Sequence, residues 1–292
     1  MTHIHFIVNP ISGKGKHNLT EPYIKTFFPA AEYEVVVHLT QRKRHAVALT
    51  KLALDQGAAI IVACGGDGTI HEVATELVGK SVLFGVVPVG SGNGLASNLA
   101  IPKDIEKALE LIRKQKVMAM DVGALNGAYF FSNMGFGIDA TIIEQYEKSG
   151  KRKLGAYIRA ALNSAQQYKA KQMRVTYNGK TKEVNPLLLF ISNSNEMGYN
   201  MSLTPQASLT DGLLDYLMVP KIGLLKQLTF GLYVLLKKTE KFRRTDYVQT
   251  AKIEVEIVNS PKNGVQIDGE YYEYDTNHFT IEVIQKSLKV IC

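Results

Sequence analysis

The chain carries three glycine-rich stretches whose residue types suit an anionic ligand. One is Gly65-Gly66-Asp67-Gly68-Thr69, which directly follows the apolar residues 58–63. Glycines let consecutive backbone amides point into one concavity, and Thr69 opens a predicted helix whose free N–H groups can face an anion. These features favour phosphate. Asp67 would repel phosphate unless it binds a metal ion or accepts a proton.

The other two glycine-rich stretches are residues 9–16, Asn-Pro-Ile-Ser-Gly-Lys-Gly-Lys, and residues 88–96, Pro-Val-Gly-Ser-Gly-Asn-Gly-Leu-Ala. The first lacks the Gly-Lys-Ser/Thr ending of a P-loop, and the second only approaches a dinucleotide fingerprint. Taken singly, each is equally compatible with an ordinary turn or helix cap. All three follow predicted strands, where ligands bind in open α/β sheets, so together they predict a nucleotide polyphosphate site.

Acidic residues gather at turns in the second half of the chain. Asp211-Gly212-Leu213-Leu214-Asp215 precedes a predicted strand, and Asp268-Gly269-Glu270 lies at a predicted hairpin. Residues 131–140 form a glycine-rich strand exit that holds Asp139. An Asp-Gly pair alone is most often only a turn. Carboxylates combined with phosphate-binding loops indicate Mg²⁺ and phosphoryl transfer.

The first part of the chain alternates strand and helix signals. The predicted strands cover residues 4–8, 33–39, 58–63 and 82–87, and the predicted helices cover residues 46–56, 70–78, 93–99 and 105–113. Strands that are apolar on both faces and separated by helices predict a parallel sheet covered on both sides. The sequence therefore predicts a doubly wound α/β domain over residues 1–122.

Strand signals dominate the remainder of the chain. Predicted strands cover residues 128–132, 173–177, 187–192, 214–219, 253–257 and 279–284, with turn signals at Asn178-Gly179, Asn263-Gly264 and Asp268-Gly269. Two helical segments, residues 154–169 and 222–241, interrupt them. This pattern predicts a second domain over residues 123–292, an antiparallel β-sandwich.

Composition limits the setting and the partners. The 292 residues are 46% hydrophobic and carry a net charge of +7, which favours an anionic partner; there is no aromatic-basic motif, so nucleic acid is not expected. Cys64 and Cys292 have neither metal-ligand spacing nor a disulfide pattern, which fits a reducing, cytoplasmic setting. The start does not read as a signal peptide. The longest apolar stretch, residues 222–236, is shorter than the ~20 residues of a membrane span, so we expect a soluble or peripheral protein.

Taken together, the glycine-rich stretches and the acidic turns resemble the motifs of one family. The chain is similar to the lipid kinases of the diacylglycerol kinase and sphingosine kinase superfamily, above all to small soluble bacterial members, over nearly its whole length. The resemblance rests on motifs that occur in the family's order: Asn9-Pro10 with Ser12-Gly13, Gly65–Thr69 with Glu72-Val73, Gly90–Asn93, Asp121 with Gly123, Asn133–Ala140, Thr204-Pro205, Asp211–Asp215 and Ile267–Glu270.

The resemblance implies a two-domain enzyme with ATP and the active site in the cleft between the domains. The residues it places around the nucleotide are Asn9, Ser12, Gly13, Thr40, Gly65, Gly66, Asp67, Gly68, Thr69, His71, Ser91 and Asn93. It implies a Mg²⁺ held by Asp211 with the backbone of Ser208 and Leu213. Bacterial relatives assign the proton acceptor to the match of Glu270, whereas sphingosine kinases assign it to the match of Asp67. Our hypothesis makes Glu270 the base and Asp67 an organiser of metal and phosphate.

The family's substrate default is diacylglycerol. Gly94 stands where many bacterial members have aspartate, and Asp139 matches the aspartate that reads the sphingoid head group in sphingosine kinases, so a sphingoid base is the alternative substrate. An NAD kinase-like enzyme and a non-catalytic nucleotide or lipid sensor are the further alternatives.

The predicted partners are the lipid and, transiently, a membrane surface, and a homodimer is compatible with the sequence. Two basic segments could contact the membrane: residues 148–153, and residues 222–236 with the cations that follow. Packing of residues 222–236 on the sandwich, with a solvated basic end, is the structural alternative.

Overall fold

The computed structural model describes residues 1–15, 17–90, 92–148, 164, 168–196 and 202–292. These residues form two compact units, the first comprising Met1–Val122 and Gln285–Cys292 and the second Gly123–Ile284. Most of the helix predicted over residues 154–169, and most of the basic segment 148–153, lie outside the described residues. No helix in the described part of the chain is long and apolar enough to cross a membrane.

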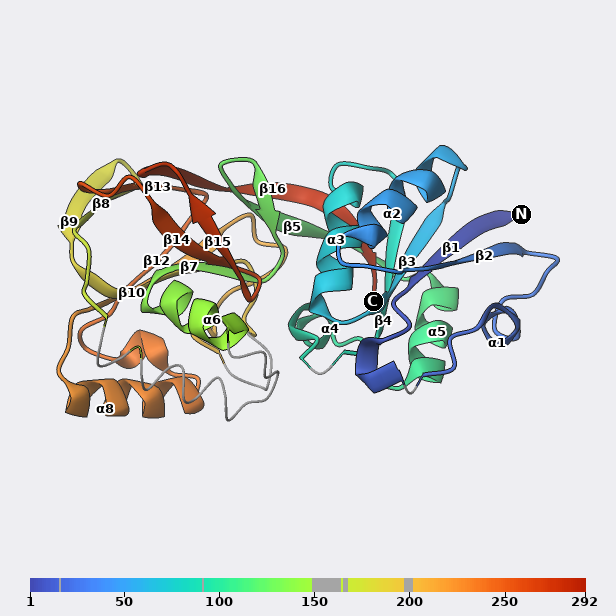
Figure 1. Cartoon of the computed structure of the whole chain (residues 1–292), viewed down its shortest axis with the longest axis horizontal. Helices are drawn as coiled ribbons and strands as arrows, with labels where there is room; N and C mark the ends of the chain where they lie inside the picture. The colour runs from blue at the N-terminus through green and yellow to red at the C-terminus, as the bar shows by residue number, and fades with distance from the viewer. Residues whose placement is uncertain (16, 91, 149–163, 165–167, 197–201) are drawn as a thin grey trace. The chain divides into compact units, whose positions relative to one another are not determined.

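A parallel sheet organises the first unit, with strand order β2-β1-β3-β4 followed by the end of β16 (His278–Ile291). The strands are β1 (Thr2–Val8), β2 (Tyr33–Leu39), β3 (Ile60–Gly65) and β4 (Leu83–Pro88). All six residues of β3 are buried, as a strand covered on both faces requires. Figure 1 shows α2 and α3 on one side of this sheet and α1 and α5 on the other. The doubly wound α/β prediction is confirmed.

The helices of this unit follow its strands in turn. They are η1 (Ser12–Gly15), α1 (Glu21–Lys25), α2 (His45–Asp55), α3 (Asp67–Leu77), α4 (Gly94–Asn98) and α5 (Ile105–Lys114). In α5 the Asp104 side chain accepts the Lys107 amide hydrogen at 3.0 Å, and the apolar face of the helix is buried. The chain then enters β5 (Val117–Leu125), which the sequence reading did not predict as a strand.

The last residues of the chain belong to the first unit. The sequence-based division gave residues 285–292 to the second domain, but in the structure they cluster with Met1–Val122. Val290, in β16 (His278–Ile291), pairs in parallel with Phe84 of β4, and its side chain is fully buried. Asp121 accepts the amide hydrogen of Lys286 at 2.7 Å. Pairing with β4 therefore places residues 285–292 in the first unit, and no local sequence pattern reveals such pairing.

The order of strands in the first unit creates a switch point. Strand β1 lies between β2 and β3, so the chain leaves β1 toward one side of the sheet and later continues on the other side. Ligands of open α/β folds bind at the carboxyl ends of strands at such a point. The loops that begin at Asn9 and at Gly66 leave the two strands on either side of it.

The second unit is built on two antiparallel sheets. One has the order β12-β11-β10-β7-β14-β15, and β13, β8 and β9 continue from β16 in the other. The remaining strands are β6 (Ala128–Phe130), β7 (Asn133–Gly137), β8 (Met173–Tyr177), β9 (Lys180–Val184), β10 (Pro186–Ser192), β11 (Leu214–Pro220), β12 (Asp246–Thr250), β13 (Lys252–Ile257), β14 (Asn263–Ile267) and β15 (Glu270–Tyr274). The predicted antiparallel β architecture is confirmed.

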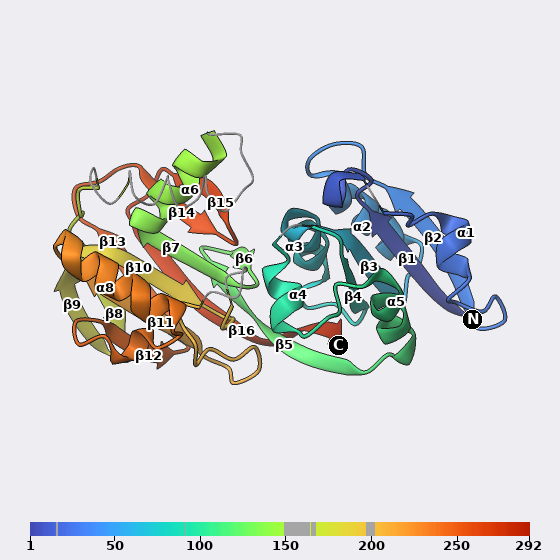
Figure 2. The same cartoon turned by 90° about the horizontal axis from the view of Figure 1, so that it is seen from below.

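Both faces of the six-stranded sheet are covered. In β10, Leu189 and Ile191 pack into the core between the sheets, whereas Leu188 and Phe190 pack into a second core on the other face. The helices α6 (Ile138–Lys148) and α8 (Leu224–Leu235) contribute to this second core, and η2 (Thr239–Lys241) directly precedes Phe242, another of its residues. Figure 2 shows α8 lying along this sheet.

Two hairpin turns match their sequence signals and one does not. Asn178 and Gly179 between β8 and β9, and Asp268 and Gly269 between β14 and β15, all have positive φ, as two-residue type I′ turns require. Asn263-Gly264 was predicted as a turn but opens β14. A Cβ on Gly264 would lie 2.5 Å from the Tyr271 ring, so this glycine makes room for a cross-strand aromatic side chain.

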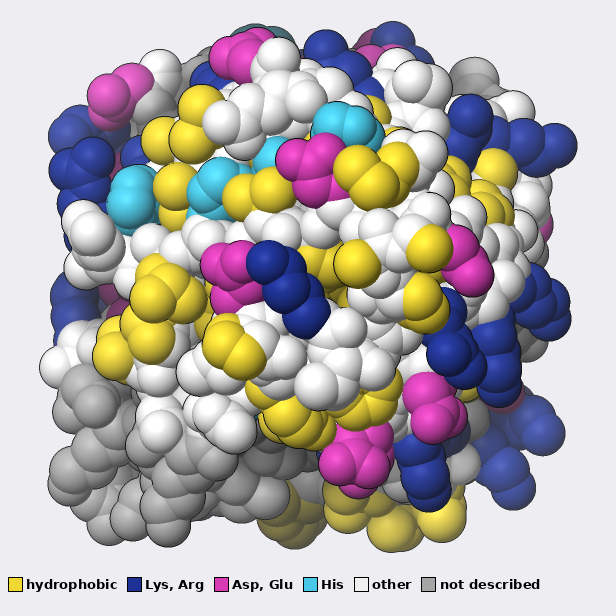
Figure 3. Space-filling view, turned by 90° about the vertical axis from the view of Figure 1, so that its right-hand side faces the viewer, with side chains coloured by type: hydrophobic (Ala, Val, Ile, Leu, Met, Phe, Trp, Pro, Cys, Tyr) yellow, Lys and Arg dark blue, Asp and Glu magenta, His cyan; other side chains and the backbone are white. Residues whose placement is uncertain are grey.

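Histidine side chains gather on one face of the molecule beside hydrophobic side chains (Figure 3). Within the first unit, His5 of β1 and His38 of β2 stack with ring centroids 5.3 Å apart, and His5 Nδ1 lies 3.1 Å from His38 Nε2. Burial, with His38 and His3 as like charges, lowers the pKa of His5 to about 4, and burial also lowers the pKa of His38. The pair is therefore built to stay neutral.

Candidate active site

The three glycine-rich loops of the first unit contact one another. Asn9 directly follows β1, and its Nδ2 donates a hydrogen bond to Thr69 Oγ1 over 3.2 Å. The Asn9 amide also donates to the Cys64 carbonyl at 2.9 Å. Gly13 has φ +60°, and a Cβ there would lie 2.5 Å from the carbonyl oxygen of Val89. The first loop is therefore fixed against both the second and the third.

Glycines allow the second and third loops to approach closely. A Cβ on Gly90 would lie 2.4 Å from the Cα of Gly66, and a Cβ on Gly92 would lie 2.8 Å from Asp67 Oδ2. At such distances the neighbouring atoms would have to move, and the Cα of Gly66 belongs to the backbone. Part of the glycine content that sequence reasoning assigned to phosphate thus serves the packing of the loops on each other. Residues 9–15, 65–69, 88–90 and 92–94 are called the loop cluster below.

Asp67 holds the loop cluster together from its centre. Its Oδ2 accepts the amide hydrogen of Asn93 at 2.9 Å, and its Oδ1 accepts that of Gly94 at 2.8 Å. Hydrogen bonds to a carboxylate are stronger than neutral ones. The Asp67 carboxylate therefore has a structural role within a glycine-rich loop suited to phosphate, because both of its oxygens bind backbone amides where α4 begins.

The remaining nucleotide candidates lie in or beside the loop cluster. Asn93 has φ +55° and donates from Nδ2 to the Gly90 carbonyl at 2.7 Å. Thr40 follows β2, is buried, and donates its amide hydrogen to the Val8 carbonyl at 2.9 Å. His71 lies half-buried on α3, and Ser12 lies in η1. Ser91 is outside the described residues.

Glu72 has a role that sequence reasoning missed. Its carboxylate accepts the amide hydrogens of Arg44 at 2.9 Å and Ala46 at 3.1 Å, at the start of α2. Arg44 itself has φ +63° and makes no side-chain cap. Glu72 therefore caps a neighbouring helix and ties α3 to α2. The only sequence signal was its place three residues after Thr69, in the Glu72-Val73 part of the family motif.

In the second unit, Asp268 supports Glu270 by fixing the turn before it. Asp268 accepts the amide hydrogens of Phe131, Ser132 and Asn133 at 2.8, 2.8 and 3.0 Å. Glu270 is the first residue of β15, is half-exposed, and accepts a hydrogen bond from the Tyr272 hydroxyl at 3.2 Å. Asp268, whose carboxylate binds three backbone amides, thus lies two residues before the half-exposed Glu270.

The Asp211 turn offers oxygen atoms of the kind that Mg²⁺ prefers. Asp211 is exposed, and its Oδ1 accepts the Leu213 amide hydrogen at 3.0 Å. Ser208 is half-exposed on the same turn. Among the described residues, no three His, Cys, Asp or Glu side chains cluster as a metal site. One carboxylate with turn oxygens still fits Mg²⁺, which keeps several of its waters when bound.

Two further acids of the second unit are buried. Asp139 opens α6, and burial raises its pKa to about 7; its Oδ2 has no hydrogen-bond partner among the described residues. Burial also raises the pKa of Asp215 to about 6, although hydrogen bonds from Tyr247 and Gln249 oppose the shift. Each environment disfavours the charged form of the carboxyl group.

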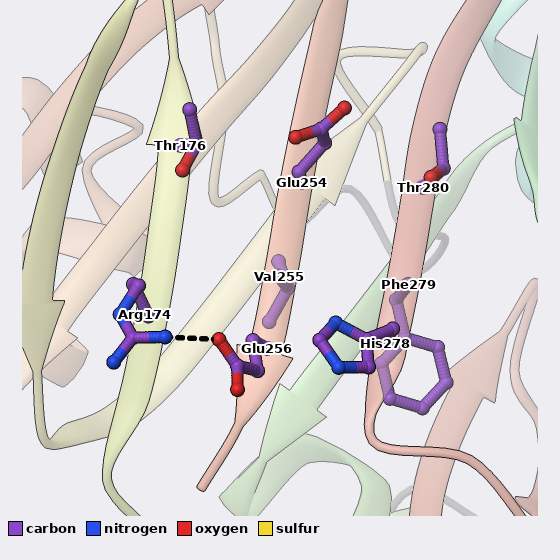
Figure 4. A pocket seen from close by; sticks show the side chains of 8 residues that line it. All are labelled: Arg174, Thr176, Glu254, Val255, Glu256, His278, Phe279 and Thr280. Atoms are coloured by element: carbon purple, nitrogen blue, oxygen red, sulfur yellow. Dashed lines mark hydrogen bonds and ion pairs between the residues drawn. The ribbon is translucent and has the colours of Figure 1, made fainter.

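A shallow hollow of about 160 Å³ on the second unit contains none of the predicted site residues. Figure 4 shows its lining on β8, β13 and β16, where Arg174 forms an ion pair with Glu256 beside His278. Arg174 pairs with Glu256 and Glu254 pairs with Lys252, so the hollow does not compete with the loop cluster as the candidate site.

Two family models match successive parts of the chain. The model for the diacylglycerol kinase catalytic domain matches residues 3–125. The model for the YegS C-terminal NAD kinase beta sandwich-like domain matches residues 132–292. Together they account for both units.

Individual relatives agree with these models. Diacylglycerol kinase from Bacillus subtilis (strain 168) is 29% identical over 278 residues, which cover 93% of this chain and 90% of that protein. Diacylglycerol kinase from Staphylococcus carnosus is 28% identical and covers 91% of this chain and 87% of its own length. A crystal structure of a candidate diacylglycerol kinase from Bacillus anthracis superposes with a TM-score of 0.81 at 25% identity, covering 99% of this chain and 94% of that one. The loop cluster, the antiparallel second unit and these matches agree, and the chain belongs to the diacylglycerol kinase superfamily of lipid kinases.

Proposed function

We propose that this kinase transfers the γ-phosphoryl group of ATP to the hydroxyl group of a diacylglycerol-like lipid. The observation that carries the proposal is the loop cluster, in which three glycine-rich loops at the carboxyl ends of parallel strands contact one another and Asp67 joins the second loop to the third. Phosphoryl transfer depends mainly on positioning and charge neutralisation, which rigid backbone amides supply. The names of the relatives add the lipid class.

The nucleotide contacts proposed here follow the loop cluster. The residues assigned to ATP are Asn9, Ser12, Gly13, Thr40, Gly65, Gly66, Asp67, Gly68, Thr69, His71, Ser91 and Asn93. Support comes from the Asn9–Thr69 hydrogen bond and from α3, whose first amides have no acceptor within the helix and can face a phosphate. Asp67 acts as a positioning residue, because its two oxygens bind the backbone of the third loop.

Glu270 is the proposed proton acceptor. It is half-exposed at the start of a strand, where the preceding Asp268 turn fixes the backbone, and it accepts a hydrogen bond from the Tyr272 hydroxyl. A general base needs such a positioned and accessible carboxylate. The proposal therefore assigns the proton acceptor to Glu270 and a positioning role to Asp67.

Asp211 is the proposed Mg²⁺ ligand, assisted by backbone atoms of Ser208 and Leu213. Bound Mg²⁺ neutralises charge on the phosphate oxygens. The exposed carboxylate and its compact turn support this assignment.

A direct test incubates the chain with γ-labelled ATP, Mg²⁺ and, in separate reactions, dispersed diacylglycerol, a sphingoid base and NAD. We expect label in the diacylglycerol product, phosphatidic acid. Label in NAD, or in none of the acceptors, would refute the proposal.

A sphingoid base is the second candidate acceptor, favoured by one observation. Asp139 is buried with an unpartnered Oδ2 among the described residues, and a cationic amine would pair with it. Preferential labelling of the sphingoid base, abolished by Asp139→Asn, would replace diacylglycerol in the proposal. In either case the lipid requires transient contact with a membrane surface.

A further inference from the structure

One helix of the second unit exposes a row of large apolar side chains. Leu225, Leu228, Leu232, Leu235 and Leu236, in and directly after α8, are 81%, 60%, 54%, 69% and 56% exposed. At 3.6 residues per turn these positions fall within an arc of about 100°. They make up half of the ten exposed large hydrophobic residues in the described part of the chain. This set is called the leucine stripe.

The opposite face of α8 fixes the direction of the leucine stripe. Phe230 and Tyr233 pack against Phe242, with ring centroids 5.4 and 5.6 Å apart, and Val234 joins the same core. The helix is thus held on the sheet by aromatic residues while its leucines point away from that core. The sequence also allowed that the whole segment 222–236 packs on the sandwich. In the structure this packing accounts only for the face of α8 that carries Phe230, Tyr233 and Val234.

Cations surround the leucine stripe. Seven exposed basic residues occur from position 221 to 244, against a single acidic residue, Glu240; the basic residues are Lys221, Lys226, Lys237, Lys238, Lys241, Arg243 and Arg244. Lys226, Lys238 and Arg243 form no ion pair with a described residue, so their charges are available to an external anion.

We propose that the leucine stripe and its surrounding cations dock the enzyme on an anionic phospholipid bilayer. Helix α8 has 12 residues and is about 18 Å long, against a hydrocarbon core of about 30 Å, so it lies in the interface and does not cross it. Leucine side chains enter the boundary between head groups and acyl chains, and lysine and arginine contact lipid phosphates. The positive charge around the stripe selects a bilayer over a second copy of the chain, because two such surfaces repel each other. The inference rests on the proposed function in one respect: a lipid substrate is the reason for the enzyme to bind a bilayer.

Vesicle co-sedimentation of the full chain tests the docking surface. We expect binding to phosphatidylcholine vesicles that contain phosphatidylglycerol, weaker binding without phosphatidylglycerol, and a decrease with added salt. Leu228→Asp combined with Leu232→Asp should lower the partition coefficient about tenfold or more, because the variant loses apolar burial and gains negative charge. The control, Leu52→Asp, changes an exposed leucine of α2 and should bind like wild type.

A fluorescence experiment reports the docking depth directly. The chain contains no tryptophan, so Leu232→Trp introduces a unique fluorophore. Anionic vesicles should shift its emission to the blue, and lipids brominated on the acyl chains should quench it, whereas Leu52→Trp should show neither effect. Vesicle binding without quenching of Leu232→Trp would overturn the proposal.

Further outcomes separate the alternatives. Wild-type failure to bind anionic vesicles, or equal binding by the double-aspartate variant, would refute the docking surface. A wild-type dimer that the variant converts to a monomer, with no vesicle binding by either, would assign the stripe to a second copy. Phosphorylation of lipid dispersed in detergent micelles isolates the proposed function, because that assay needs no bilayer docking. Its failure together with intact vesicle binding would refute the kinase reaction alone.

Discussion

The loop cluster of the first unit and the acidic turns of the second unit are held in place differently. In the loop cluster the candidate residues contact one another: Asp67 binds the backbone of the third loop, and Gly66 faces Gly90. In the second unit a separate residue, Asp268, fixes the turn before Glu270. Changes in the loop cluster should therefore spread among its loops, whereas Glu270 can be changed without disturbing its support.

The largest expected effect comes from Glu270→Gln, which keeps the shape of the side chain and removes its basicity. The turnover number should fall about 10²–10⁴-fold while the KM for ATP stays unchanged, because a general base contributes on that order. Asp67→Asn should instead raise the KM for ATP, since the loops that it joins loosen. Steady-state kinetics with both variants checks the contrast. Full turnover in Glu270→Gln with complete loss in Asp67→Asn would exchange the two roles.

Gly90→Ala should break the loop cluster without removing any polar group. The new Cβ would lie 2.4 Å from the Gly66 Cα, so the backbone must move. We expect ATP affinity to fall about 100-fold, or about 2.7 kcal/mol, by calorimetry. Gly231→Ala is the matched control, because nothing lies within 4 Å of its Cβ position and φ is not positive there. Wild-type ATP binding by Gly90→Ala would show that the loops do not need this approach.

Asp268→Ala should show that the support of Glu270 is structural. Three backbone amides lose a charged acceptor, so we expect a loss of about 3 kcal/mol in the free energy of unfolding, measured with urea. Asp275→Ala provides the comparison, because Asp275 forms only an exposed ion pair with Lys262 and its loss should cost under about 1 kcal/mol. Equal stability of the two variants would contradict the assigned role of Asp268.

The smallest expected effect is an opposite pH response of the two units. The pKa of His5 falls to about 4 in the folded state, so the unfolded chain binds more protons below pH ~6.5 and His5 destabilises the fold as pH falls. The pKa of Asp139 rises to about 7, so the folded chain binds more protons between pH ~3.8 and 7 and Asp139 stabilises the fold as pH falls.

Urea unfolding of wild type, His5→Asn and Asp139→Asn at pH 7 and pH 5 measures both signs. Relative to His5→Asn, wild type should lose stability on acidification; relative to Asp139→Asn it should gain stability. The same sign for both residues would contradict the opposite burial effects.

Local sequence patterns predicted much of the fold. The strands predicted over residues 33–39 and 173–177 match β2 and β8 residue for residue, and both type I′ turns carry their Asn-Gly or Asp-Gly signal. The prediction failed at Asn263-Gly264, where the glycine accommodates Tyr271 of the next strand. It missed β7 as a strand because its glycines hide the strand propensity. At Asn263-Gly264, a residue of the next strand therefore outweighed the local turn signal.

The sequence by itself determined the two-part architecture, the glycine-rich loops at strand ends and the identity of the candidate acids, because periodicity, turn residues and motif order are local properties. Only the tertiary structure decided what each acid does: Asp67 joins two loops, Glu72 caps α2, and Asp268 supports a turn. It also decided that the leucines of α8 remain exposed while its aromatic residues are held in the core. Hydrogen bonds and burial between distant segments set these roles, and such contacts exist only once the chain has folded.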